Sequence, residues 1–151
     1  MKAYKHILVP TDGTSLSLKA AKQAASLAKD LKAKVTAVYV IPPWTPPMTD
    51  EGSAIATLAF TEAQYRKDME ARASKALDKV AVAAAGSKVE CDTLSIGGAQ
   101  PWEGILKAAR AKKCDLIVMA SHGRGALRSL VLGSETTKVL SHSRTPVLVC
   151  R

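Results

Sequence analysis

Two uninterrupted apolar runs constrain the fold of this chain more than any other feature. One is His6–Pro10, which ends at a proline, and the other is Leu116–Ala120. A strand with one face in water alternates apolar and polar residues, so unbroken runs of this length indicate strands that are buried on both faces. Such strands belong at the centre of a parallel sheet.

Helical patterns separate the strand patterns along the sequence. The predicted strands span 6–10, 34–41, 88–96, 116–120 and 145–150. The predicted helices span 16–31, about 55–85, 101–112 and 133–141, and the second is either one long helix or two helices with a break near 60–64. This alternation predicts an α/β fold with a single domain over residues 1–151. Its five parallel strands form an open, doubly wound sheet with helices on both faces.

Composition narrows the compartment and the class of protein. The apolar fraction is 47% and the charged fraction 23%, as in ordinary globular domains. No apolar run is long enough to span a bilayer, and the first residues resemble no signal peptide, so we expect a cytoplasmic protein with no membrane partner. Cys91, Cys114 and Cys150 lie far apart without zinc spacing, and we interpret them as small core residues in a reducing compartment.

The formal net charge of +9 raises the question of an anionic partner. Residues 1–75 carry 11 basic and 7 acidic side chains, and residues 76–151 carry 11 and 6. The excess is therefore spread evenly along the sequence, with no basic tail. This distribution favours a solvated surface and disfavours nucleic-acid binding.

The loops that follow the two apolar runs carry the candidate site. Ligands of open parallel sheets bind beyond the carboxyl ends of the strands, where the strand order reverses. If the first and fourth strands are neighbours, the loops after Pro10 and after Ala120 face each other, beside the end of the second strand at Val40–Ile41. The chain contains neither GxxxxGK[ST] nor GxGxxG after the first strand. What remains is a turn at Gly123 and a helix start at Gly133-Ser134, where backbone N–H groups suit a phosphate.

The spacing of these residues resembles a known family. Ala120-x2-Gly123-x9-Gly133-Ser134 is similar to the Gly-x2-Gly-x9-Gly-(Ser/Thr) motif of nucleotide-binding universal stress proteins of the UspA type. The opening Ile7–Gly13 and the closing Pro146–Val149 also resemble that family, so the likeness covers the whole chain. It implies a universal stress protein domain over 1–151 and a Rossmann-like sheet of strand order 3-2-1-4-5.

The resemblance also implies a ligand, namely ATP, or AMP or ADP, with any Mg²⁺ bound through the phosphates. Pro10 and Thr11 would shape the wall, and Asp12 would hydrogen-bond the adenosine. Val40 would meet adenine through its backbone, and Met119 would pack near the base or sugar. Ala120 takes the glycine position beside the ribose. At the phosphate end, Gly123, Gly133 and Ser134 would supply N–H groups and one hydroxyl, flanked by His122 and Arg124, whose charge would assist, and by Glu135, the first-turn acid of the last helix.

Ala120 is the one departure from the motif, and it supports an alternative. A family member that does not bind nucleotide would act as a dimeric protein-interaction module. The methyl group matters if position 120 needs a positive φ or a close approach of ribose, and it is harmless if the backbone is ordinary β. Plainer interpretations also exist for Asp12 as a turn or cap residue and for Ser134 as an N-cap.

The chain shows no motif for catalysis. Ser121 and His122 are adjacent, but adjacency in sequence is not the geometry of a catalytic triad. We expect at most slow ATP hydrolysis, and an output through conformation and assembly. The apolar strand Val147–Cys150 lies at a predicted edge of the sheet, where a second chain can pair with it. This position predicts a homodimer, which the family resemblance also implies.

Overall fold

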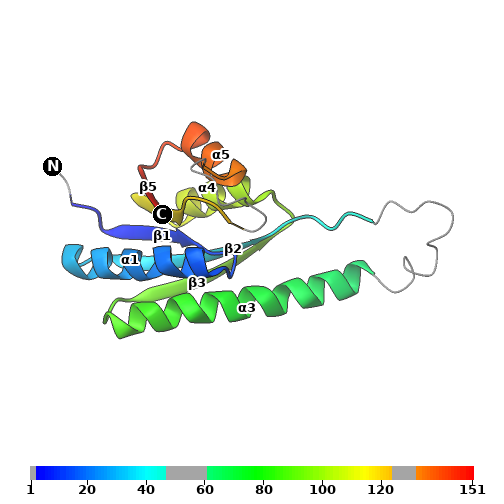
Figure 1. Ribbon diagram of the computed structural model, residues 1–151, viewed down its shortest axis with the longest axis horizontal. Coiled ribbons are helices and arrows are strands. Elements are labelled where there is room, and N and C mark those ends of the chain that lie inside the picture. Colours follow the sequence, from blue (N-terminus) through cyan, green and yellow to red (C-terminus); the bar gives the residue numbers. More distant parts are fainter. Residues whose placement is uncertain (1–2, 47–60, 124–131) are drawn as a thin grey trace.

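The computed structural model describes residues 3–46, 61–123 and 132–151, which form one α/β layer structure (Figure 1). The strands are β1 (His6–Pro10), β2 (Lys34–Ile41), β3 (Cys91–Gly97), β4 (Leu116–Ala120) and β5 (Val147–Cys150). The helices are α1 (Ser15–Leu31), α3 (Glu62–Gly86), α4 (Pro101–Ala111) and α5 (Ser134–His142). All strand pairs are parallel in the order β3-β2-β1-β4-β5, which confirms the predicted topology.

Both faces of the sheet are covered, as the unbroken apolar runs predict. Ile7 and Val9 pack in one apolar cluster with α1 and α3, while Leu8, between them, packs in a second cluster with α4. Figure 1 shows α1 and α3 on one side of the sheet, with α4 and α5 on the other. Every residue of β1 and β4 is buried. Within the described ranges, no helix is long and apolar enough to cross a membrane.

Helix α1 begins at a defined cap and packs closely on the sheet. The Thr14 side chain accepts a hydrogen bond from the Ser17 N–H, so Thr14 rather than Ser15 is the N-cap. Ala20, Ala24 and Ala28 are fully buried along one stripe of the helix. Their small side chains let α1 approach the sheet and fix the loop that precedes it.

Helix α3 covers most of the long helix that was predicted over about 55–85. It begins at Glu62 after the N-cap Thr61, which accepts from the Gln64 N–H, so a helix start falls inside the predicted break. Residues 55–60 of the predicted helix lie outside the described residues. A glycine near a helix end commonly adopts the left-handed conformation just after the last turn, but Gly86 does not. Gly86 is the last helical residue, and Lys88 has the positive φ, at 58°.

Other element starts also differ from the prediction, and α1 begins at Ser15 rather than at residue 16. β3 begins at Cys91 rather than at residue 88 and forms one edge of the sheet, and β5 begins at Val147 rather than at residue 145. Helix α5 begins at Ser134, with Gly133 as its N-cap, so the interpretation of Ser134 as the N-cap is wrong.

The cysteines are mostly core residues, as expected. All three are free, Cys114 and Cys150 are buried, and Cys91 is half-buried. Burial raises the pKa of the Cys114 thiol to about 11, with the nearby Asp115 carboxylate adding to the effect. Such a thiol is protonated and inert at neutral pH.

The two central strands separate toward their carboxyl ends. β1 pairs with β2 at five positions, from His6 to Pro10, but with β4 only at Ile7 and Leu8. Pro10 still pairs with Val38 of β2, but it has no N–H to donate to a further ladder bond. The strand order reverses between β1 and β4, and a crevice opens there.

Candidate functional site

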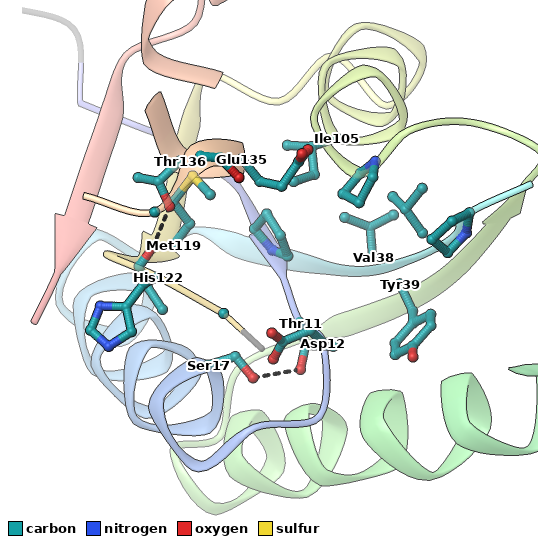
Figure 2. A pocket seen from close by; sticks show the side chains of 18 of the residues that line it. Thr11, Asp12, Ser17, Val38, Tyr39, Ile105, Met119, His122, Glu135 and Thr136 are labelled. Atoms are coloured by element: carbon teal, nitrogen blue, oxygen red, sulfur yellow. Dashed lines mark hydrogen bonds between the residues drawn. The ribbon is translucent and has the colours of Figure 1, made fainter. Parts of the chain in front are cut away.

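A cavity of about 610 Å³ lies at the carboxyl edge of the sheet (Figure 2). It is bordered by the ends of β1, β2 and β4 and by the starts of α4 and α5. Eleven of the twelve predicted site residues line it, namely Pro10, Thr11, Asp12, Val40, Met119, Ala120, His122, Gly123, Gly133, Ser134 and Glu135. The twelfth, Arg124, lies outside the described residues.

Sequence reasoning missed nine further lining residues: Ser17, Val38, Tyr39, Pro42, Met69, Pro101, Ile105, Leu132 and Thr136. Val38 and Ile105 were detectable in principle, because each is an apolar position near the pocket end of a correctly predicted element. Met69 carries no such signal. It reaches the cavity because α3 continues past the carboxyl edge of the sheet, and the angle of a helix is not encoded in its own residues.

Asp12 organises the loop after β1. One of its carboxylate oxygens, Oδ1, accepts hydrogen bonds from the Thr14 N–H at 2.9 Å and from the Thr14 hydroxyl at 2.6 Å. The Thr11 hydroxyl accepts from the Gly13 N–H at 3.2 Å and lies 3.1 Å from Ser17 Oγ (Figure 2). Gly13 has φ 83°, a conformation that favours glycine. The turn role suggested for Asp12 is therefore present in the structure.

Gly123 brings the second loop against the first. A Cβ atom on Gly123 would collide with Oδ2 of Asp12. The loop after β4 therefore lies so close to the Asp12 carboxylate that a side chain at position 123 would require the carboxylate or the loop to shift. This contact joins the two halves of the predicted pocket across the gap between β1 and β4.

Ala120 has an ordinary strand backbone. It is the last residue of β4, paired with Cys150 of β5, and it is absent from the positive-φ residues of the described chain. Ala120 as a whole is 8% exposed, and it belongs to the apolar cluster that packs with α1. Its carbonyl accepts a hydrogen bond from the Thr136 hydroxyl at 3.1 Å, drawn in Figure 2. Position 120 therefore has the ordinary β backbone for which the sequence analysis expects the methyl group to be harmless.

Gly133, just before α5, contacts the residues that directly follow β4. The Gly133 N–H donates to the Ser121 carbonyl at 2.8 Å, and a Cβ on Gly133 would lie 3.0 Å from the His122 Cα. This N–H is therefore used within the loop, contrary to the expectation that it faces a phosphate. The first N–H groups of α5, from Ser134 onward, have no partner within the helix, and Gly133 provides no side-chain cap.

Glu135 ties the starts of two helices together. Its Oε2 accepts a hydrogen bond from the Trp102 N–H at 2.8 Å, and its Oε1 lies 3.4 Å from Lys138 Nζ. The N-cap of α4, Gln100, makes no side-chain cap bond. Glu135 therefore caps α4 from a position 33 residues away in the sequence.

The opposite wall of the cavity is apolar and closely packed. A Cβ on Gly104 would lie 2.6 Å from both methyl carbons of Val40, so α4 rests directly on β2. The Tyr65 hydroxyl donates to the Pro42 carbonyl at 2.8 Å and holds the segment after β2 against α3. The cavity thus offers an apolar slot at one side and glycine turns with a helix start at the other. Such a site suits a ligand with a flat apolar group and an anionic end.

No group of three or more His, Cys, Asp or Glu side chains that suits a metal ion occurs among the residues the structure describes. His122 Nδ1 lies 3.0 Å from Ser121 Oγ.

Topology and cavity place the protein among the open, doubly wound α/β proteins whose crevice lies at the switch point of a parallel sheet. The sequence pattern of the Universal stress protein family matches residues 3–151. The universal stress protein MJ0531 of Methanocaldococcus jannaschii is 36% identical over 151 residues, which cover 98% of this chain and 82% of that protein. The chain therefore belongs to the universal stress protein family.

Solved structures share the fold. The structure of MJ0577 superposes with a TM-score of 0.76 at 26% identity, covering 98% of this chain and 96% of that one. A universal stress protein in complex with cAMP gives 0.72 at 24% identity, with 99% of both chains covered. The universal stress protein from Archaeoglobus fulgidus in complex with dAMP gives 0.66 at 16% identity, covering 99% of this chain and all of that one.

Proposed function

We propose that this chain binds an adenine nucleotide, ATP or AMP or ADP, in the cavity at the carboxyl edge and acts as a cytoplasmic, dimeric stress-response module. The observation that carries the proposal is the pairing of an apolar slot with a glycine-lined polar end in one cavity. The slot matches the adenine base, and the start of α5 matches phosphate charge.

The described residues suggest how the ligand would be held. Val40 and Met119 would flank the base, and the Asp12 loop would meet the ribose. The Ser134 hydroxyl and the first N–H groups of α5 would take the phosphates, with Gly123 beside them. Gly133 would contribute by allowing the loop to close rather than by its own N–H. Any Mg²⁺ would be held mainly by the phosphates.

Two observations favour nucleotide binding over the alternative of a family member without a ligand. Ala120 has the ordinary extended backbone that makes its methyl group compatible with the motif. Two fold relatives are complexes with cAMP and with dAMP, which are both adenine nucleotides. The second candidate, a dimeric interaction module, rests on β5. This strand is an edge of the sheet, and Leu148 on it is 45% exposed.

The test begins with the purified protein, denatured to release any bound small molecule for mass analysis. We expect adenine nucleotide in near-stoichiometric amount, or a thermal shift when ATP is added. Absence of both would reject nucleotide binding and leave the interaction module.

A matched pair of variants then locates the site. Gly123→Ala requires the Asp12 carboxylate or the loop to shift and should weaken ATP binding at least about tenfold, measured by calorimetry. Gly86→Ala, where nothing lies within 4 Å of an added Cβ, should bind as the wild type does. Equal affinity in both variants would move the site elsewhere.

The proposed output is conformational, and hydrolysis is at most slow. The residues described here include no nucleophile paired with a base and an orienting carboxylate in the observed hydrogen bonds. Binding would instead stabilise the contact between Ser121 and Gly133 and the packing of α4 against α5.

A further inference from the structure

A basic residue precedes every strand of the sheet. Seven exposed lysine and arginine side chains occupy these positions: Lys5 before β1, Lys32 and Lys34 at the start of β2, Lys88 before β3, Lys112 and Lys113 before β4, and Arg144 before β5. They are dispersed along the sequence, which is why the charge looks even there. Parallel strands all begin at one edge, so the fold gathers these cations at the amino edge, opposite the cavity.

The strand register keeps this row in line. Val35 pairs with Cys91 and with Ile7, Ile7 pairs with Leu116, and the next residue of β4 pairs with Val147. Neighbouring strands lie about 4.8 Å apart, so four intervals spread the row over roughly 19 Å. Figure 1 shows α1 and α3 both ending on the left, where β2 and β3 begin.

The amino edge has a large excess of positive charge. The five segments before the strands (3–5, 32–34, 87–90, 112–115 and 143–146) contain seven basic residues and two acidic ones, Glu90 and Asp115, a net charge of +5. Asp115 already accepts backbone hydrogen bonds from Lys5 and His6 at 2.9–3.1 Å. The salt bridges found among the described residues, Arg66–Glu62 and Lys138–Glu135, lie elsewhere. By contrast, the described connections at the carboxyl edge contain one residue among Lys, Arg, Asp and Glu, namely Asp12.

Three of the lysines occupy a backbone conformation that favours glycine. Lys32, Lys88 and Lys113 have φ values of 53°, 58° and 54°, each directly before a residue whose N–H closes the end of a helix. A left-handed non-glycine residue costs about 1 kcal/mol. Interaction with the helix dipole offsets part of that cost. Lys5 precedes β1 and Lys34 begins β2, so neither interacts with the dipole at a helix end. The property that all members of the row share is therefore positive charge.

We propose that the amino edge binds duplex nucleic acid through its phosphates, without reading the bases. A row of roughly 19 Å spans five or six phosphates of one strand at about 3.4 Å each along the duplex axis. Single strands are held largely by stacking on aromatic side chains. Tyr4 is the one aromatic residue in the five segments. A membrane surface would require an apolar face beside the cations, and Tyr4, 36% exposed, is the one large exposed apolar side chain described there.

The test uses the full chain and a fluorescent duplex of about 20 base pairs, with anisotropy measured across a salt series. Neutralising about five phosphates predicts a slope of log K against log salt near −4.5, a loss of about 500-fold in affinity between about 50 and 200 mM salt. The triple variant Lys32→Gly, Lys88→Gly, Lys113→Gly should show a slope near −1.8 and a loss of about 12-fold. Glycine suits these backbone positions, so the variant should fold.

A control variant separates the edge from overall charge. Lys67→Ala, Lys75→Ala, Lys79→Ala removes three exposed lysines from α3 and the same net charge. It should keep the wild-type slope. The proposal is overturned by absence of duplex binding at the lowest salt, by equal loss in both triple variants, or by binding to phosphatidylserine vesicles without binding to duplex. None of these outcomes depends on whether the cavity binds nucleotide.

Discussion

At the scale of single residues, His6 couples the sheet to pH. It is 8% exposed at the start of β1, and its Nε2 lies 2.7 Å from the Thr36 hydroxyl oxygen. Burial lowers the pKa of His6 from its usual 6.5, and the nearby Lys34 charge lowers it further. In the unfolded chain the imidazole regains its ordinary pKa. Between the two values the unfolded state holds more protons, so the free energy of unfolding falls as the pH drops through 6.5.

We predict that His6→Gln flattens this pH dependence. Glutamine keeps a hydrogen-bonding group for Thr36 but does not titrate. Urea unfolding between about pH 7.5 and 5.5 should show a shallower loss of stability than in the wild type, by up to about 1.4 kcal/mol per pH unit. An unchanged slope in His6→Gln would assign the effect to other groups.

The backbone of Ala120 leads to a second prediction. Since its φ is ordinary and its methyl group packs toward α1, Ala120→Gly should change ATP affinity by less than about threefold. Loss of one buried methyl and the added flexibility of glycine should lower the free energy of unfolding by about 1 kcal/mol. Calorimetry and urea unfolding measure the two effects. A tenfold gain in affinity would show that the methyl obstructs the ligand.

At the scale of elements, Glu135 links α4 to α5. Glu135→Ala should lower the free energy of unfolding by about 1 kcal/mol, because the Trp102 N–H loses its acceptor at the start of α4. Glu135→Gln retains an acceptor and should lose less. Glu103→Ala, an exposed first-turn acid of α4 with no such bond observed, is the control for helix-dipole effects. If the alanine variants at both positions lose the same stability, the bond to Trp102 is not the cause.

Elements that depend on local sequence were predictable, and contacts between distant elements were not. The runs at β1 and β4 indicate burial on both faces from their own residues, and the order of the sheet agrees. Gly86 is a natural helix terminator by composition, yet the bond from Val89 to Ala84 moves the left-handed residue to Lys88. The use of the Gly133 N–H by Ser121 and the bond from Trp102 to Glu135 join residues that no local pattern connects.

At the scale of the whole molecule, β5 bears on assembly. Among the strands that the structure describes it pairs with β4 alone, and Leu148 is 45% exposed. We expect a dimer by light scattering at micromolar concentration, and Leu148→Lys should convert it to a monomer because a charge would be buried in the interface. Val82→Lys, at a 71% exposed site on α3, should remain dimeric. A monomeric wild type would contradict the dimer itself.

The early separation of β1 from β4 has an evolutionary consequence. Because β1 and β4 pair only at Ile7 and Leu8, the crevice is present in the strands before any loop contributes to it. The sheet itself thus forms the crevice, while its chemical character depends on a few loop residues such as Asp12 and Gly123. Substitutions at such positions can change the chemistry of the cavity while the sheet keeps its architecture.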